Sequence, residues 1–320
     1  MEVVDDLSRC PHPPGGTVVT IGAYDGVHLG HRRLIERVRQ LAAEGGCASA
    51  VVTFDRHPAQ VVRPESAPKL LTDLPTKLER LAATGVDYTV VVHFDQDRAR
   101  EPAEDFVRTV LAGCLAARVV VVGHDFHFGH NRGGNVDLLR RLGPELGFEV
   151  LGLELFDDDD GDPVSSTRVR QLLGAGDVES AAALLGRPHR LRGVVVAGDK
   201  RGRELGFPTA NVAVPDEYCL PADGIYAGWF ERPAGDRLPA AISLGRRPTF
   251  YADAPASLLE CYVLDFDGDL YDEEVGVEFV ARLRPELRFD GPGALERLVA
   301  QMHTDVQDTR KVLGVLGTGR

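Results

Sequence analysis

The stretch Thr20-Ile21-Gly22-Ala23-Tyr24-Asp25-Gly26-Val27-His28-Leu29-Gly30-His31 decides the fold of the first half of the chain. It follows an apolar run at residues 18–21, which is typical of a buried strand. After it, apolar residues recur at helical spacing, at Leu34, Ile35, Val38 and Leu41. The sequence therefore predicts a strand, a glycine-rich turn and a helix, in that order.

The start of a helix after such a turn favours the binding of anions. The first backbone N–H groups of a helix lack partners within the helix and lie at the positive end of its dipole, so phosphate binds there. Gly22, Gly26 and Gly30 would let a phosphate come close to the backbone. His28 and His31 are three residues apart and can face the same anion. The turn is neither a Walker loop nor the dinucleotide fingerprint, because the following residues and the glycine spacing differ.

This stretch resembles the HxGH signature of the nucleotidylyltransferases. The resemblance implies that His28 and His31 bind a nucleoside triphosphate and stabilise the charge that develops when its α-phosphate is attacked and pyrophosphate leaves. A His-x-x-His pair could also be half of a metal site or a surface pair, but the strand, turn and helix around it favour phosphate. The contacts to ATP implied for this turn are Gly22, Tyr24, Asp25, Gly26 and Gly30.

Composition limits the classes of protein and partner. A chain of 320 residues with 43% hydrophobic residues is long enough for two domains with their own cores. Its net charge of -13 argues against nucleic-acid binding, which needs a basic surface. The five cysteines are scattered and include no Cys-x-x-Cys pair, which predicts reduced, intracellular thiols. We find no signal peptide and no membrane-spanning run, so we expect a cytoplasmic protein. The sequence does not reveal the oligomeric state, and a weak homo-oligomer is left open.

Apolar strands alternate with helices along the first half of the chain. The apolar runs lie at residues 18–21, 50–54, 89–92, 119–122 and 150–153. The helical patterns between them lie at residues 32–44, 74–83, 102–115 and 136–146. This alternation predicts an α/β domain with a doubly wound, Rossmann-like parallel sheet. Ligands of such sheets bind beyond the carboxyl ends of the strands.

Two loops that follow predicted strands carry polar and aromatic side chains. One covers residues 53–58 and the other residues 123–134. Flat rings in these loops could stack on a planar ligand or could belong to the core. The side chains that we assign to a flavin are Phe54, His57, Asp125, Phe126, Phe128 and Arg132.

Residues 155–170 contain an acidic run followed by hydroxyl and arginine side chains. Asp157 to Asp160 are typical of a solvated turn, with a metal site as the alternative. Ser165, Ser166 and Thr167 are either a helix N-cap or a second cradle for phosphate, to which Arg168 would add a bidentate charge. The HxGH superfamily carries such an element opposite its histidines, which favours the cradle.

The pattern changes after a Gly-x-Pro at residues 186–188, which predicts domains at 1–186 and 187–320. Two short helices, at residues 168–173 and 178–185, precede this boundary. Short strands follow it, at residues 192–197, 210–214, 224–231, 240–244, 258–264 and 275–283. They predict a six-stranded antiparallel β-barrel, with Asp267-Gly268 as a hairpin turn and a C-terminal helix to about residue 312.

Two features of this second domain point to chemistry. A basic, glycine-rich loop at residues 198–211 ends in Pro-Thr-Ala-Asn, and Thr209 and Asn211 would share one face of a strand. Their oxygens are hard ligands suited to Mg²⁺ that bridges phosphates. Glu260 lies in an otherwise apolar strand, where a carboxylate is either a general base or an edge residue facing water.

Together these motifs resemble the bifunctional bacterial riboflavin kinases/FMN adenylyltransferases, or prokaryotic FAD synthetases. The resemblance covers nearly the whole chain, and Gly-Phe-Pro-Thr-Ala-Asn at residues 206–211 is its most specific part. It implies that the barrel phosphorylates riboflavin, with Mg²⁺ on Thr209 and Asn211 and with Glu260 taking the proton of the ribityl 5′-hydroxyl. The residues implied to contact the phosphates of ATP there are Gly198, Lys200, Gly202, Gly206 and Pro208.

For the first domain the resemblance implies adenylyl transfer. The phosphate of FMN attacks the α-phosphate of ATP, while His28, His31 and Arg168 stabilise the transition state and FAD is formed. Tyr262 stands where histidine is frequent, and Ser243 where asparagine is frequent. One alternative is an HxGH enzyme for another phosphorylated acceptor with a non-catalytic, flavin-binding barrel, and another is a barrel that serves only for binding.

Overall fold

The computed structural model describes residues 1–320 except 155, 158–160, 199–200, 246–257 and 317–320. The chain divides into two compact units, Met1–Ser166 and Thr167–Arg320. Helices α7 (Ser166–Ala175) and α8 (Val178–Leu185) lie between this division and the boundary expected after residue 186, and α8 packs on barrel strands of the second unit. The expected boundary stays a prediction.

The first unit contains a six-stranded parallel sheet, as the alternating pattern predicts. Its strand order is β1-β4-β3-β2-β5-β8. β1 was not predicted, because it is three residues long and only one of them is buried. The strands are β1 (Glu2–Val4), β2 (Thr17–Ile21), β3 (Ala48–Phe54), β4 (Tyr88–Val92), β5 (Ala117–Gly123) and β8 (Glu149–Leu153). β6 (His127–Phe128) and β7 (Gly134–Asn135) form a small antiparallel pair in the loop after β5.

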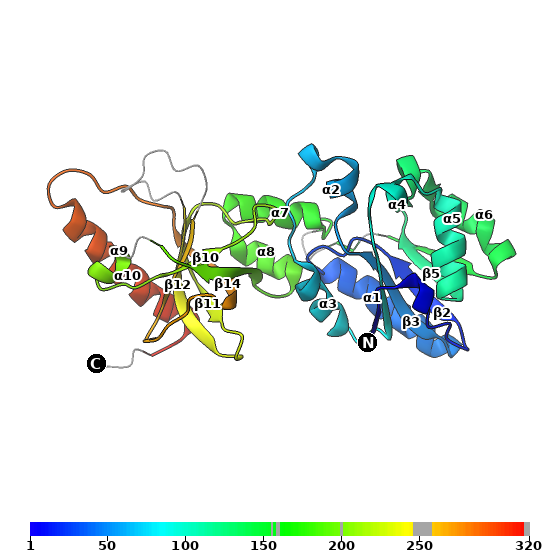
Figure 1. The fold of residues 1–320 in the computed structure, drawn as a ribbon, viewed down its shortest axis with the longest axis horizontal. Coiled ribbons are helices and arrows are strands. Elements are labelled where there is room, and N and C mark those ends of the chain that lie inside the picture. The colour runs from blue at the N-terminus through cyan, green and yellow to red at the C-terminus, as the bar shows by residue number, and fades with distance from the viewer. Residues whose placement is uncertain (155, 158–160, 199–200, 246–257, 317–320) are drawn as a thin grey trace. The chain divides into compact units, whose positions relative to one another are not determined.

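Helices cover both faces of the sheet (Figure 1). α1 (Leu29–Gly45) and α3 (Leu74–Ala82) contribute Ile35, Val38 and Leu81 to the core of one face. The opposite core is formed by α5 (Ala103–Phe106), the π-helix η3 (Val107–Cys114) and α6 (Val136–Leu146). The short helices α2 (Pro58–Val62) and α4 (Gln96–Arg100), and the 3-10 turns η1 (Leu7–Arg9), η2 (Pro64–Ser66) and η4 (His130–Arg132), complete the unit.

The expectation that all five cysteines are thiols is wrong. Cys10 and Cys114 form a disulfide across 104 residues of sequence. The winding of the chain brings the loop before β2 next to the end of η3, a proximity that the spacing of cysteines in the sequence does not reveal. Cys47, Cys219 and Cys261 are free thiols.

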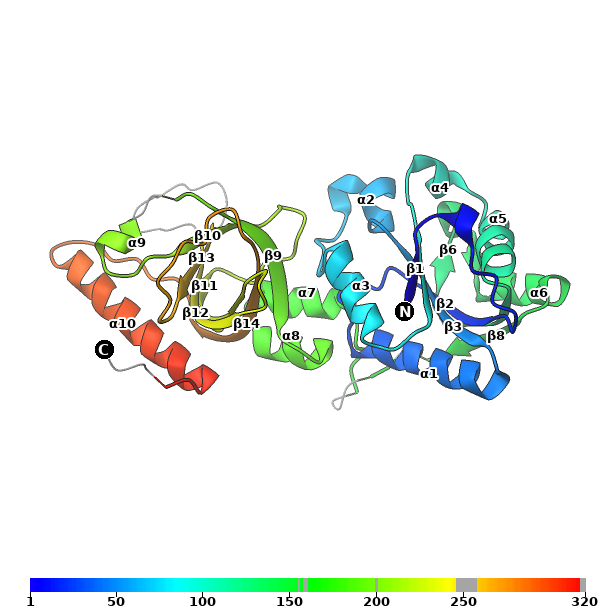
Figure 2. The same cartoon turned by 60° about the horizontal axis from the view of Figure 1, so that its bottom comes forward.

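The second unit is a closed antiparallel barrel with the strand order β10-β13-β12-β11-β14-β9 (Figure 2). Buried apolar side chains, among them Val212, Tyr226, Ile242 and Leu259, fill its interior. The strands are β9 (His189–Val196), β10 (Ala210–Ala213), β11 (Gly224–Glu231), β12 (Arg237–Gly245), β13 (Leu258–Val263) and β14 (Glu274–Arg284).

Two local expectations for the barrel are wrong. Asp267-Gly268 is not a hairpin turn, because β13 and β14, which flank it, are not neighbours in the barrel. The loop before β10 contains a short helix, α9 (Arg201–Glu204), where the sequence indicated irregular chain. Glycines within a basic segment obscured that turn of helix.

The C-terminal helix α10 (Ala294–Leu313) packs on the outer faces of β11, β12 and β14. A buried ion pair joins it to the barrel: Arg284 Nε and Nη2 donate to the two carboxylate oxygens of Asp305, at 2.8 and 2.6 Å. Gln301 Nε2 also donates to Asp305, at 3.0 Å, and the Asp305 side chain is 8% exposed. The pair therefore holds the helix against the strands.

Asp305→Ala should reduce the free energy of unfolding of the second unit by about 3 kcal/mol, because it leaves the buried Arg284 charge without its carboxylate. Denaturant unfolding followed by the fluorescence of Trp229, the only tryptophan, would measure this. The matched control is Asp308→Ala. The Asp308 side chain is 42% exposed, so its loss should reduce the free energy of unfolding by less than about 1 kcal/mol. Equal effects of the two variants would contradict the role of the buried pair.

Candidate functional sites

The turn between β2 and α1, residues 22–27, has an unusual backbone. Tyr24 and Val27 have φ of 50° and 40°, and Gly26 has φ of 82°. Non-glycine residues seldom adopt this left-handed conformation, and each such residue costs about 1–3 kcal/mol. Contacts from outside this β2–α1 turn must therefore hold it in place.

Those contacts come mainly from the residues that precede α3. The carboxylate of Asp25 accepts hydrogen bonds from the backbone N–H groups of Leu71, at 3.0 Å, and Thr72, at 3.1 Å. The Thr72 hydroxyl also lies 3.2 Å from Asp25 Oδ1 and accepts from Gly26 N–H at 3.1 Å. Asp25 is only 5% exposed. In this structure its carboxylate fixes the turn, and its expected contact with ATP stays a prediction.

Tyr24 is also held from within the unit. Its hydroxyl lies 2.8 Å from Thr20 Oγ1, and burial raises the pKa of the phenol well above its ordinary value. Gly22 lies against the Tyr24 ring, since a Cβ at this glycine would be 3.1 Å from it. The Tyr24 phenol thus stays neutral, and its hydrogen bond to Thr20 ties the turn to β2.

The two histidines stand at the start of α1. His28 is the N-cap residue, and its Nδ1 accepts from the backbone N–H of His31 at 3.3 Å. The two rings stack with centroids 3.6 Å apart. Because Nδ1 accepts a hydrogen bond, a neutral His28 carries its proton on Nε2, which can donate to a ligand. A Cβ at Gly30 would lie 3.2 Å from the His28 ring, so a glycine permits this close packing.

A cavity of about 680 Å³ opens beside these histidines. Its walls follow the carboxyl ends of β2, β5 and β8, next to the point where the strand order reverses, which is the usual ligand position in such sheets. The predicted site residues that line it are Gly22, Tyr24, His28, Gly30, His31, Asp125, Phe126, Arg132, Ser165 and Ser166. The structure thus brings together three segments that lie far apart in sequence.

Other predicted residues lie elsewhere in the first unit. Phe54 packs edge-on against Phe94, at 5.2 Å between ring centroids, and Phe128 packs against Phe106, at 5.9 Å. His57 caps α2, with Nδ1 accepting from Ala59 N–H at 3.2 Å. None of the three is among the residues that line the cavity. Phe54 ends β3 and His57 follows it, on the other side of β2 from β5 and β8.

Ser166, the first residue of α7, stabilises the β2–α1 turn. Its hydroxyl donates to the backbone carbonyl of Asp25 at 2.9 Å. Thr167 and Arg168 follow on the first turn of α7, in the second compact unit. Their contacts with phosphate stay predictions.

The residues that sequence reasoning missed include two that line this cavity and one that lies below it. The guanidinium of Arg33 stacks over the Phe156 ring, at 3.5 Å from its centroid, and both residues line the cavity. Lys77 is buried under the β2–α1 turn. The sequence could have indicated Lys77, because a lysine at a core-facing position of a predicted helix is unusual. No local pattern indicated Arg33 or Phe156.

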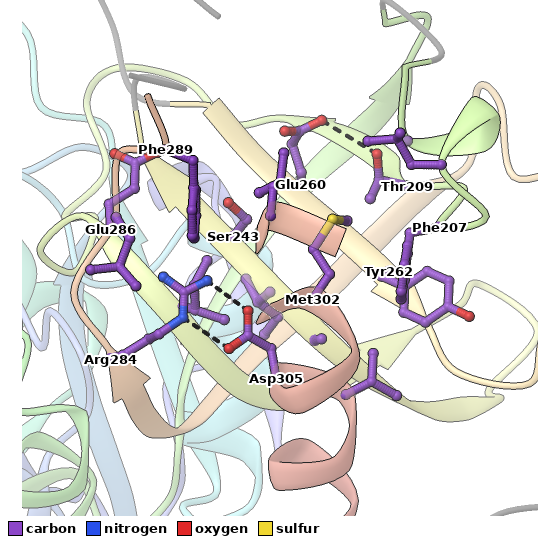
Figure 3. A pocket seen from close by; sticks show the side chains of 18 residues that line it. Phe207, Thr209, Ser243, Glu260, Tyr262, Arg284, Glu286, Phe289, Met302 and Asp305 are labelled. Atoms are coloured by element: carbon purple, nitrogen blue, oxygen red, sulfur yellow. Dashed lines mark hydrogen bonds and ion pairs between the residues drawn. The ribbon is translucent and has the colours of Figure 1, made fainter. Parts of the chain in front are cut away.

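In the barrel, the candidate residues lie on its outer face. Asn211 is directly opposite Glu260, and Glu260 is directly opposite Ser243, across three neighbouring strands. Opposite residues share a face, and the residues next to them in each strand are buried in the interior. Thr209 Oγ1 lies 3.3 Å from Glu260 Oε1, and a dashed line marks this hydrogen bond in Figure 3.

Two cavities meet at Thr209. One is a narrow, mostly apolar slot of about 170 Å³ between the outer face and α10, lined by Glu260 and Ser243 as well as Phe207 and Met302 (Figure 3). The other, of about 600 Å³, is lined by Arg203, Pro208 and residues 266–271. Thr209 lines both.

The glycines of the loop before β10 allow its close packing. A Cβ at Gly198 would overlap the amide of Asn211, and one at Gly202 would overlap the carbonyl oxygen of Phe207. Gly206 has φ of 86°, which suits glycine. Lys200 lies outside the described residues, as do Asp158 to Asp160 of the acidic run.

Among the described residues, no group of three or more His, Cys, Asp or Glu could hold a metal ion. A metal in the barrel would therefore depend on Thr209 and Asn211 oxygens, with Glu260 nearby. In the part of the chain that the structure describes, no helix is long and apolar enough to cross a membrane.

Two protein-family models match the chain. The family described as FAD synthetase matches residues 10–168, and the family described as riboflavin kinase matches residues 185–313. The order of the two matches agrees with the order of the two candidate sites.

Similar proteins match nearly the whole chain. Proteins named bifunctional riboflavin kinase/FMN adenylyltransferase are 38% identical in Listeria monocytogenes (92% of this chain and 91% of that protein) and 39% identical in Pseudomonas fluorescens (97% of each). One from Escherichia coli K12 is 36% identical over 98% of this chain and 97% of its own length. A crystal structure described as a macrolide-efflux protein from Streptococcus pneumoniae superposes with a TM-score of 0.82 at 30% identity, covering 97% of this chain and 98% of that one.

Thr72→Val should weaken the β2–α1 turn, because it removes the hydroxyl that bonds both Asp25 and Gly26 N–H. We expect the KM for ATP, with FMN as acceptor, to rise roughly tenfold, the equivalent of about 1.4 kcal/mol. The control is Thr84→Val, which removes a hydroxyl bonded to Leu81 O after the other end of α3. An unchanged KM in Thr72→Val, or an equal rise in the control, would contradict the bracing role of Thr72.

Proposed function

The chain belongs to the family of bifunctional riboflavin kinases/FMN adenylyltransferases, and we propose how the residues of its two candidate sites carry the two reactions. The enzyme phosphorylates riboflavin to FMN and transfers the adenylyl group of ATP to FMN, giving FAD and pyrophosphate. A non-catalytic barrel, the alternative left open by the sequence, does not agree with this family. The cytoplasmic location and weak self-association stay predictions.

In the barrel, riboflavin occupies the slot under α10, and ATP occupies the cavity beside Pro208. The observation that carries this assignment is that both cavities meet at Thr209, 3.3 Å from the Glu260 carboxylate. The ribityl 5′-hydroxyl then gives its proton to Glu260 as its oxygen bonds to the γ-phosphorus, and the bond to the β-phosphate oxygen breaks to release ADP. Positioning supplies most of the catalysis.

Thr209 and Asn211 hold Mg²⁺ at this end of the outer face. Their hydroxyl and amide oxygens, close to the Glu260 carboxylate, form the hard donor set that this ion prefers. When bound, the ion neutralises charge on the phosphates of ATP. Gly198 and Gly202 let the loop pack close to Asn211 and Phe207, where side chains would not fit, and Gly206 supplies a positive φ.

In the first unit, a phosphate oxygen of FMN bonds to the α-phosphorus of ATP, and the bond to the β-phosphate oxygen breaks to release pyrophosphate. His28 Nε2–H, His31 and the N–H groups at the start of α1 donate to the phosphate oxygens as charge develops. Ser165 and Ser166, which line the same cavity, add their hydroxyls to this anion cradle, and the family resemblance implies a positive charge from Arg168. Asp125, Phe126 and Arg132 contact FMN, which is supported by their place in the same cavity.

Glu260→Gln should abolish the formation of FMN, because the amide cannot take the hydroxyl proton. We expect riboflavin phosphorylation to fall at least about 100-fold, while conversion of added FMN to FAD stays within about twofold. Chromatographic separation of the flavins measures both rates on one sample. The control is Glu274→Gln, an exposed glutamate on another strand. Loss of both activities in a folded Glu260→Gln protein would contradict separate sites.

His28→Ala should have the reverse effect. With riboflavin, ATP and Mg²⁺ we expect FMN to accumulate and the rate of FAD formation to fall about 100- to 1000-fold, since a donor to the developing charge is lost. His12→Asn, on the exposed loop before β2, serves as the control. A normal yield of FAD from His28→Ala would remove the assignment of the first unit.

A further inference from the structure

Lys77, on α3, is a buried lysine that the two reactions described above leave without a role. It is 7% exposed, although lysine is among the residues least often buried. Its Nζ donates to the backbone carbonyl of Phe54 at 2.7 Å and to that of Ala23 at 3.3 Å. The side chain thus joins the end of β3 to the β2–α1 turn.

The Ala23 carbonyl is a point at which the turn can be held. Ala23 precedes the left-handed Tyr24, and its carbonyl also accepts from Thr53 Oγ1 at 3.2 Å. Together with the bonds to Asp25, these contacts tie the turn to β3 and to α3. Movement of Ala23 would shift the turn and the start of α1, where Gly22, His28 and Gly30 line the cavity.

Lys77 also places a charge beneath an anion site. Burial lowers the pKa of its ammonium to about 8, while the nearby carboxylates of Asp25 and Asp55 act in the opposite direction. At neutral pH the group is therefore largely protonated. Both carboxylates are engaged by backbone N–H groups, Asp25 with Leu71 and Thr72, and Asp55 with Phe94.

We infer that Lys77 is a positioning residue for adenylyl transfer, whose ammonium fixes the Ala23 carbonyl and so aligns the β2–α1 turn with the phosphates of ATP. This inference rests on the proposed function of the first unit. Lys77 is not among the residues that line the cavity, so it is not a catalytic residue. It acts through the backbone of the turn and through its positive charge.

Lys77→Met keeps the length of the side chain and removes its charge and N–H donors. The kcat for conversion of FMN to FAD should fall about 100-fold, the effect of displacing reacting groups by about 1 Å. Riboflavin phosphorylation by the same sample should stay within about twofold, which serves as an internal test of folding. The matched control is Lys311→Met, whose side chain is 75% exposed on α10 and whose loss should change neither rate.

Lys77→Arg tests whether the positive charge of residue 77, and not only its packing, supports adenylyl transfer. The wild-type ammonium loses its proton as pH rises through about 8, whereas a guanidinium stays charged. The ratio of FAD formation in Lys77→Arg to that in the wild type should therefore rise about threefold or more between about pH 7 and pH 9. His28, His31, Asp25 and Asp55 are common to both proteins and cancel in the ratio.

Three results would overturn the inference: adenylyl transfer within twofold of wild type in Lys77→Met, equal loss of both activities, or a flat ratio across this pH range. If Lys77→Met does not fold, the inference is tested by the pH dependence of FAD formation in Lys77→Arg relative to the wild type alone. Failure of the proposed function would look different, because His28→Ala would then still form FAD at the normal rate.

Discussion

The hydrogen bonds between the Asp25 carboxylate and the backbone of Leu71 and Thr72 are the constraint on which the first site depends. The β2–α1 turn contains two non-glycine residues with positive φ, so it would not keep its shape in an isolated peptide. A buried carboxylate costs free energy unless it is fully hydrogen-bonded. The Asp25 carboxylate is satisfied only when the turn lies next to Leu71 and Thr72, so these two segments fix each other's positions. The shape of the proposed phosphate site therefore depends on the segment before α3 as much as on the glycine-rich sequence.

The barrel carries its candidate residues on an outer face rather than in a turn before a helix. Its interior is filled with apolar side chains, and the polar row of Asn211, Glu260 and Ser243 lies on the outside. An outer face is open to water until another element covers it. α10, joined to β14 by Arg284 and Asp305, provides that cover over the apolar slot. The C-terminal helix is thus part of the site rather than an addition to the fold.

Sequence patterns predicted the elements that are locally determined. The bounds of β11, α6 and α8 agree with the predicted ranges, because each has a clear period and a distinct end, such as Gly147 after α6 and Gly186 after α8. β1 was too short to show a period, and the pairing of β13 away from β14 is a property of barrel closure. The disulfide of Cys10 and Cys114, like the contact of Asp25 with Leu71, depends on distant parts of the chain. Local motifs thus predicted residues that line the cavities, but not those that hold these residues in place.

Charge explains why the supporting groups matter. The chain carries a net charge of -13, yet its substrates include ATP and FMN, which are anions. At physiological ionic strength the field of surface charges is screened within about 8 Å, so groups at the site itself must attract the phosphates. In the site proposed for the first unit these groups are backbone N–H donors at the start of α1, His28 and His31, with Lys77 buried below them. Backbone donors have a fixed direction, and they favour a phosphate only if the turn that carries them does not move. Rigidity of the β2–α1 turn and attraction for the anion are therefore the same requirement, and the contacts from α3 meet both.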